Sequence, residues 1–443
     1  MALPTEAEAR EIIARVLGQS KAESCRVSIG GGNRGNVRFA RNAVSTSGTT
    51  SNSSLVVESS FGTRSGAARA NAFDAETIAR TVATSEELAR LAPEDPEFMP
   101  PLGPQTYQQS AAWADATAAL DGARRAEAAR VGIAAAREAG CVAAGFLEHG
   151  ASTSALGNSA GLFAYHRETS SNYTVTMRTP DGTGSGFGTS DSHDASRLDV
   201  AAASRIAAQK ANASRSPRAI EPGKYTVILE PAASVDLLQY LVFDMSARSA
   251  DEGRSSFSRQ GGTRLGEKLL DERVSIVSDP SNTLAPSGTW DDDGRPVGRT
   301  TWIDRGTVAN LYYSRYWAAK QKHDATPGPA NFLMQGGSKS TEELIASTER
   351  GILVTRTWYI RGVDPQTLLF TGLTRDGTFY IENGAIRHAV KNMRFNESPI
   401  VMLNNVDELG MPVRVSNAET ALPSVVPPMR LRDFTFSSLS DAV

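Results

Sequence analysis

The chain has 443 residues, of which 40% are hydrophobic and 21% are charged, and its formal net charge at pH 7 is -3. These proportions are those of an ordinary globular protein. The near-neutral charge gives no reason to expect nucleic acid or an anionic membrane as a partner. A chain of this length exceeds what one hydrophobic core usually organises, so we expect two large domains.

The cysteines and the N-terminus indicate the compartment. Cys25 and Cys141 are too few and too far apart for a disulfide framework or a Cys-rich zinc site, so a reducing compartment is the expectation. The N-terminus lacks the basic and apolar regions of a secretory signal, and no segment approaches the run of about 20 apolar residues that spans a bilayer. We therefore expect a cytoplasmic protein without a membrane partner.

The first half of the chain, residues 1–220, predicts an α+β domain. Thr5 and Glu8 form a capping-box pair before an apolar helical stretch, and Asp74 is placed to cap a second helix. The segments between these helices alternate with a period of two, which predicts an antiparallel meander. Beyond them the expected elements are a Pro-rich linker at 93–104, a helix at 115–140, strands at 141–179, a mobile Gly/Ser-rich loop at 181–192 and a helix at 195–214.

The second half, residues 221–443, opens with a strand, a turn marked by Pro231 and a helix that we interpret as amphipathic. The polar face of this helix carries Gln239, Tyr240 and Asp244. Most later segments have strand composition, with short helices near 310–322 and 341–347 and hairpin dipeptides at Asp376-Gly377 and Asn383-Gly384. Strands and helices grouped in blocks predict an α+β fold of two domains, with strand-rich mixed sheets packed against helices.

Two glycine motifs have a functional and a structural interpretation. Gly30 to Gly35 matches a dinucleotide-binding fingerprint, but a strand rather than a helix follows it, so a hairpin connection is the favoured interpretation. Gly157 to Gly161 matches a nucleophile elbow with Ser159 as the nucleophile. Another strand follows this motif too, so a tight turn is favoured.

Other potential ligand groups are scattered along the chain. Asp291 to Gly294 lacks the ligand pattern of a calcium loop and predicts a solvated turn. None of the histidines has the close spacing to a second ligand that a local metal motif needs. These residues are His149, His166, His193, His323 and His388.

Several segments resemble the TldD/PmbA family, a group of cytosolic zinc-peptidase subunits and their paralogues. The most specific likeness is at 351–399, which begins GILVTRTWYIRG, and further likeness lies at 225–257 and 288–318. The resemblance implies the two-domain α+β fold of that family. It extends more loosely to the N-terminal meander and the linker, and so covers nearly the whole chain.

The resemblance also implies what this chain lacks. Catalytic members carry HExxxH on the helix after Pro231, and a later cysteine completes their zinc site. The corresponding positions here hold Gln239, Tyr240 and Asp244, and no cysteine follows Cys141. An amide is a poor zinc ligand and a phenol with a pKa near 10 is a poor base, so we expect no catalytic residue, no metal site and no cofactor in this chain.

The sequence thus resembles the PmbA (TldE-like) branch, which implies a non-catalytic subunit of a peptidase that acts on short or unfolded peptides. Zinc would be held only by a TldD-like partner with HExxxH, and the chain would complete the substrate cavity of that partner. The residues proposed to line this cavity are Tyr359, Arg361, Arg375, Asn383 and Asn396.

Two alternatives stay open. The first is an independent hydrolase that uses Ser159, or a noncanonical carboxylate site around Asp244 and Asp251. The second is a homodimeric peptide-binding scaffold. Both alternatives depend on local features, whereas the family resemblance covers most of the chain.

Overall fold

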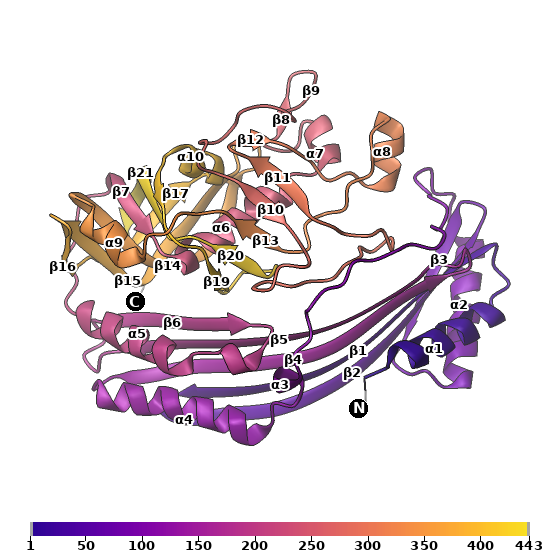
Figure 1. Ribbon diagram of the computed structural model, residues 1–443, viewed down its shortest axis with the longest axis horizontal. Helices are drawn as coiled ribbons and strands as arrows, with labels where there is room; N and C mark the ends of the chain where they lie inside the picture. Colours follow the sequence, from indigo (N-terminus) through magenta and orange to yellow (C-terminus); the bar gives the residue numbers. More distant parts are fainter. Residues whose placement is uncertain (1–2, 441–443) are drawn as a thin grey trace.

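The computed structural model describes residues 3–440, which form two strand-rich halves (Figure 1). The first half is a six-stranded antiparallel sheet with helices on one face, and the second half is built on a six-stranded and a seven-stranded sheet. Helices and strands occur in blocks, so the predicted α+β class is confirmed. Within residues 3–440, no helix combines the length and apolar character needed to cross a membrane.

The first half contains most of the long elements. They are α1 (Glu6–Gln19), β1 (Ser24–Ala40), β2 (Ala43–Phe61), β3 (Arg64–Ala70), α2 (Ala75–Leu91), α3 (Asp115–Ala118), α4 (Gly122–Glu138), β4 (Val142–Asn158), β5 (Phe163–Arg178), β6 (Ser185–Ser192), η1 (Ala195–Arg197) and α5 (Val200–Ala213). The strand order is β3-β2-β1-β4-β5-β6. The predicted caps are present, because Thr5 and Glu8 form the capping box of α1 and the Asp74 carboxylate accepts from the amide of Thr77 in α2.

The hairpin connection predicted at Gly30 to Gly35 is wrong, because these residues lie inside β1 and pair with both β2 and β4. The turn comes later, at Arg41 and Asn42, which both adopt positive φ. Gly35 instead makes room for a neighbour, since a Cβ there would lie 2.3 Å from the Arg125 guanidinium. Arg125, on α4, is itself only 6% exposed.

The segment predicted as a mobile loop at 181–192 is also different, because Ser185–Ser192 is the edge strand β6. Helix α5 packs directly on its backbone. A Cβ on Gly184, Gly186 or Gly188 would lie 2.0 to 2.2 Å from the carbonyl oxygen of an alanine in α5. The glycines therefore permit close helix–strand packing, and do not make the segment mobile.

The second half begins with β7 (Gly223–Leu229) and α6 (Pro231–Phe243). The elements that follow are α7 (Ala247–Asp251), β8 (Ser258–Arg259), β9 (Gly262–Thr263), β10 (Ile276–Ser278), β11 (Thr300–Asp304), β12 (Thr307–Val308), α8 (Arg315–Gln321), β13 (Phe332–Met334), α9 (Thr341–Ala346), β14 (Arg350–Asp364), β15 (Leu369–Glu382), β16 (Ala385–Ala389), β17 (Met393–Glu397), α10 (Pro399–Asn404), β18 (Val406–Leu409), β19 (Val413–Val415), β20 (Ser424–Val426) and β21 (Met429–Leu439).

Two sheets surround α6 in this half. One has the order β12-β11-β10-β13-β20-β19, and the other has the order β14-β7-β21-β17-β15-β16 with β18 beside β21. An additional pairing between β14 and β15 closes the second sheet on itself. Asn383-Gly384 forms the predicted turn between β15 and β16, whereas Asp376-Gly377 lies in an irregularity within β15, opposite Thr355.

The two halves meet along β6. The side chain of Phe187 is buried in the core of the second half, and the Ser185 hydroxyl donates to the Asp376 carboxylate at 2.5 Å. Asp376 is 1% exposed and forms an ion pair of 3.2 Å with the buried Arg356. Farther along the strand, Asp191 pairs with Arg414. The sheet edge formed by β6 is thus covered by the second half.

Candidate functional site

The helix after Pro231 is the centre of the candidate site. Glu230 precedes it in an extended conformation and Pro231 occupies its first turn, where no amide donor is needed. Apart from its last residue, Phe243, nearly all of α6 is buried, including the polar residues Asp236 and Gln239. The amphipathic interpretation is therefore wrong, and the polar side of α6 faces another part of the protein.

That part is the connection between β19 and β20, residues 416–423, which we call the strap. Gln239 holds it through both ends of its amide group. The Gln239 Nε2 donates to the carbonyl of Leu422 at 3.1 Å and to the Ser424 hydroxyl at 2.7 Å, and Oε1 accepts from the amides of Ala421 and Leu422. A side chain so fully bonded is a structural clamp.

Asp236 holds the other end of the strap. Its carboxylate accepts from the Thr420 hydroxyl at 2.6 Å and from the Asn417 amide at 3.0 Å. Burial raises the pKa of Asp236 from 3.8 to about 6, because a buried carboxylate loses its hydration. Asp236 lies on the same helix face as Gln239 and Tyr240, three and four residues on.

Tyr240 links the strap to β14. Its hydroxyl donates to Glu419 at 3.0 Å, and Glu419 forms an ion pair of 3.0 Å with Arg361. Burial, together with the neighbouring Glu419, raises the pKa of Tyr240 to about 12, so the phenol stays protonated at neutral pH and cannot act as a base. The Tyr240 ring also stacks on Phe370 with a centroid separation of 4.5 Å.

Tyr359 lies beside this chain of contacts. The pairing of β14 with β15 is irregular between Trp358 and Arg361, and Tyr359 has a φ of 55° within that bulge. The residue is 53% exposed, with the Arg361 guanidinium 4.3 Å from the ring centroid. A bulky residue in this conformation is strained, and such strain is common at binding sites.

Asp244 does not join the site. It follows the last turn of α6, and its carboxylate accepts from the Ser256 hydroxyl at 2.6 Å and the Ser256 amide at 2.8 Å. Burial raises its pKa, although the bonds from Ser256 and Ser255 oppose the shift. Gln239, Tyr240 and Asp244 were predicted on one polar face of the helix. In the structure Gln239 and Tyr240 contact the strap, whereas Asp244 bonds to residues 255–256.

The residues around α6 do not fit a zinc ion. Zinc in proteins takes four ligands from thiolates, imidazoles and carboxylates, and the described residues contain no group of three or more such side chains placed to hold a metal. Gln239 would have to break its hydrogen bonds to the strap before its side chain could bind a metal ion. The arrangement can therefore hold a segment of chain, and we assign no metal-dependent step to it.

The other predicted cavity residues are spread over the second half. Arg375 lies near Asp376 at 3.8 Å and over the Trp358 ring at 5.2 Å. Asn383 is exposed in the turn after β15, and Asn396 is exposed on β17. The structure thus brings Arg361 to the strap with Tyr359 beside it, whereas Arg375, Asn383 and Asn396 lie elsewhere.

The residues of the hydrolase alternative are not assembled. Ser159 lies in a tight turn between two strands, as predicted, and its hydroxyl accepts from the amide of Cys25 at 3.1 Å. An elbow needs a strand that turns into a helix. Asp251 accepts from the Trp317 indole at 2.7 Å, whereas the Asp244 carboxylate is bonded to Ser255 and Ser256.

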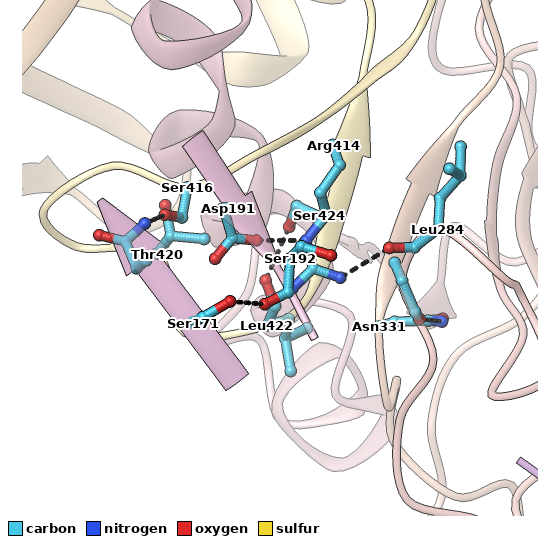
Figure 2. A network of polar contacts seen from close by, with 12 residues as sticks. Ser171, Asp191, Ser192, Leu284, Asn331, Arg414, Ser416, Thr420, Leu422 and Ser424 are labelled. Carbon is cyan, nitrogen blue, oxygen red and sulfur yellow. Dashed lines mark hydrogen bonds and ion pairs between the residues drawn. The ribbon is translucent and has the colours of Figure 1, made fainter. Parts of the chain in front are cut away.

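The strap also reaches the first half of the chain. Ser416 accepts from the Asn172 amide of β5 at 2.6 Å. Figure 2 shows Arg414, just before the strap, between Asp191 of β6 and the carbonyl of Leu284. The segment 414–424 is therefore held by α6 on one side and by the first sheet on the other. The sequence offered no signal for it, since a polar loop does not reveal which helix it contacts.

Comparisons with known proteins give the class to which this fold and site belong. Residues 222–438 match the PmbA/TldA metallopeptidase C-terminal domain, and residues 114–215 match the PmbA/TldA metallopeptidase central domain. Together these matches cover more than half of the chain. The chain belongs to the TldD/PmbA family.

Solved structures agree on the fold. TldE from Thermococcus kodakarensis has a TM-score of 0.87 at 18% identity, over 97% of this chain and 99% of that chain. A putative modulator of a DNA gyrase from Thermotoga maritima has a TM-score of 0.86 at 17% identity, over 97% of this chain and 100% of that chain. At such identities the likeness shows the fold alone.

One curated relative has a broader name. A "Metalloprotease" of Methanothermobacter thermautotrophicus is 26% identical over 169 residues, which are 34% of this chain and 36% of that protein. The aligned part thus spans about a third of the length of the relative. Its name applies to that protein, and activity for the present chain is a matter of proposal.

Proposed function

We propose that this chain is a non-catalytic, PmbA/TldE-like subunit of a TldD/TldE-type metallopeptidase. In this proposal a TldD-like partner with HExxxH supplies the zinc and the cutting, in the cytoplasm. The chain completes the cavity that admits short or unfolded peptides, and it carries no cofactor of its own.

The observation that carries this proposal is that the strap binds the polar side chains of α6. At the helix positions where the family resemblance puts a zinc motif, Gln239 and Tyr240 bind the strap. Each of these side chains is committed to a structural bond, and Tyr240 cannot serve as a base. A chain that keeps the family fold but uses this helix to hold its own segment suits a supporting role.

The experiment compares the chain alone with the chain plus a TldD-type subunit. Purified alone, it should contain no stoichiometric zinc and should not cleave an unstructured peptide. Adding the partner should produce cleavage, and a partner whose motif glutamate is replaced by glutamine should not. Stoichiometric zinc, or cleavage by the chain alone, would contradict the proposal.

A homodimeric peptide-binding scaffold is the second candidate. The exposed, strained Tyr359 beside Arg361 favours it, because an exposed aromatic ring is a common contact for a bound peptide. Fluorescence titration of the chain with an unstructured peptide tests this candidate. Saturable binding in the absence of any partner, lost in Tyr359→Ala, would support it over the subunit proposal.

A further inference from the structure

The outer side of strand β5 is only partly paired. Strand β6 pairs with β5 from Ser171 onward, so among the strands within residues 3–440 residues 163–170 pair with β4 alone. The Thr169 amide points away from β4, since it donates to the Ala112 carbonyl at 2.9 Å. Main-chain groups two residues apart in a strand point the same way. The amide and carbonyl groups of residues 163, 165 and 167 therefore also point outward, away from β4.

A cavity of about 640 Å³ lies beside this part of β5. One wall is formed by residues 163–167, and the other by residues 105–111 of the connection from α2 to α3, which passes between the sheet and the second half (Figure 1). Contacts to the second half hold this connection in place, since the Tyr107 hydroxyl donates to the Gly294 carbonyl at 2.8 Å. The volume lies in the range of about 300–1,000 Å³ that is typical of ligand sites.

Two stacked arginines determine the charge of the cavity. The Arg10 guanidinium lies 3.7 Å from the centroid of the Phe163 ring, and the Arg167 guanidinium lies 4.8 Å from that of the Trp113 ring. A guanidinium stacked on a ring can still bind a carboxylate through its N–H edges. Glu6 is the only carboxylate among the lining residues, and it pairs with Arg10 at 3.0 Å. Arg167 forms no ion pair with a carboxylate in the part of the chain that the structure describes, so the cavity favours an anionic ligand.

We propose that this cavity binds an extended acidic peptide segment, which adds to the edge of β5 as a further strand. The outward main-chain groups of residues 163–167 bind the peptide backbone, and the Arg167 guanidinium binds an acidic side chain of the peptide. Gln108 and Gln109 line the opposite wall and supply further donors and acceptors. The inference rests on the proposed function only in taking this peptide as a substrate, because the binding itself is a property of this chain alone.

The test measures binding by the purified chain, without a partner and without zinc, so its failure would leave the subunit proposal untouched. The probe is a short fluorescein-labelled peptide that alternates glutamate and serine and has both termini blocked. Fluorescence anisotropy should show saturable binding with a dissociation constant on the order of 100 µM. A peptide with glutamine in place of glutamate should bind about tenfold more weakly. Added salt should weaken binding of the acidic peptide, because it screens exposed charges.

Substitutions at exposed charges test the location of the site. Arg167→Gln should weaken binding of the acidic peptide about fivefold, whereas Arg205→Gln, at an exposed arginine on α5 that does not line the cavity, is the matched control and should leave binding unchanged. Glu6→Gln should strengthen binding about threefold, because Arg10 then loses its competing carboxylate. A gain in affinity cannot come from a misfolded variant, so this substitution separates the inference from a folding defect.

Backbone methylation of the peptide tests the addition of a strand. In an extended peptide the amides of alternate residues point to opposite sides. Of two peptides that are N-methylated either at the glutamates or at the serines, one should therefore lose its hydrogen bonds to β5 and its binding. The other should bind like the unmethylated peptide.

Three results would overturn the inference. The first is an acidic peptide that shows no saturable binding at about 1 mM, well above the expected dissociation constant. The second is equal binding by Arg167→Gln and Arg205→Gln, which would place the site elsewhere. The third is binding of both methylated peptides as tight as that of the parent, which would mean that the main chain of β5 takes no part.

Discussion

The two edges of the six-stranded sheet differ in how they are covered. At β6, glycines bring the backbone of α5 close, and Ser185, Phe187 and Asp191 each contact the second half of the chain. At β2, residues 43–50 are exposed and, among the strands within residues 3–440, pair with β1 alone. One edge therefore connects the two halves, and the other is exposed.

The difference teaches where this chain uses its polar groups. Around β6 and α6, buried side chains such as Asp236, Gln239 and Asp376 bond to other parts of the same chain. Residues 43–50 of β2 also carry polar side chains, but these are exposed, and the Ser45 and Ser47 hydroxyls donate to carbonyls of the neighbouring strand β1. Buried polar side chains therefore join distant parts of the chain around β6 and α6, whereas the exposed serines of β2 bond to the adjacent strand.

Among the substitutions considered, Asp376→Asn, which lies against β6, should lower the free energy of unfolding most. The change keeps the shape of the side chain but removes the negative charge beside the buried Arg356, 3.2 Å away. Leaving a buried cation unpaired costs about 3–5 kcal/mol, so the free energy of unfolding in urea should fall by about that amount. Asp304→Asn, at an exposed carboxylate, is the control. A loss below about 1 kcal/mol at Asp376 would mean that water compensates Arg356.

A glycine-to-alanine pair compares the edges directly. In Gly186→Ala the new Cβ would lie 2.1 Å from the carbonyl oxygen of Ala207, so α5 must move. We expect a loss of about 3 kcal/mol from overpacking. Gly48→Ala meets open space at the other edge and should be neutral or stabilising by about 0.5 kcal/mol. Equal effects in thermal unfolding of the two variants would remove the distinction between the edges.

The glycines also show what the sequence can and cannot predict about the fold. Caps at Thr5 and Asp74 act within one turn of helix, so the pattern predicts them correctly. Gly35 and Gly186 have a different cause, since each makes room for a group far away in sequence. Local rules interpret such glycines as turns or loops, and both predictions failed for that reason.

Only the helix α6 of the candidate site could be predicted from the sequence. The strand–Pro–helix pattern located α6, and the family resemblance drew attention to Gln239 and Tyr240. Asp236 was missed, although its place four residues before Tyr240 puts both on one helix face. The strap could not be predicted, because its contacts with α6 join residues about 180 positions apart and no periodic pattern marks them.

Asp236→Asn should change how stability depends on pH. Because burial raises the pKa of Asp236 from 3.8 to about 6, the folded chain holds this proton more tightly than the unfolded chain. Its contribution to stability is complete below the ordinary pKa and is lost as pH rises through about 6. From about pH 4 to pH 7 this loss is about 2 kcal/mol, and the variant should lack it.

The measurement is the free energy of unfolding of both proteins across that pH range. Asp244 and Glu397 also have raised pKa values from burial, so the wild-type slope alone is not diagnostic. The difference between the two curves isolates Asp236. Parallel curves would show that the carboxylate titrates alike in the folded and unfolded chain, and so that the strap does not bury it.

The smallest expected effect belongs to the exposed end of the strap. Arg361→Gln removes an ion pair of 3.0 Å with Glu419, but the Arg361 side chain is 53% exposed. Such a pair contributes about 0.2–1 kcal/mol. A double-mutant cycle with Glu419→Gln measures the coupling, and Tyr240→Phe reports on the partly buried bond to the same carboxylate. A coupling above about 2 kcal/mol would mean that Arg361 anchors the strap as firmly as a buried pair does, so that the strap is fixed along its whole length.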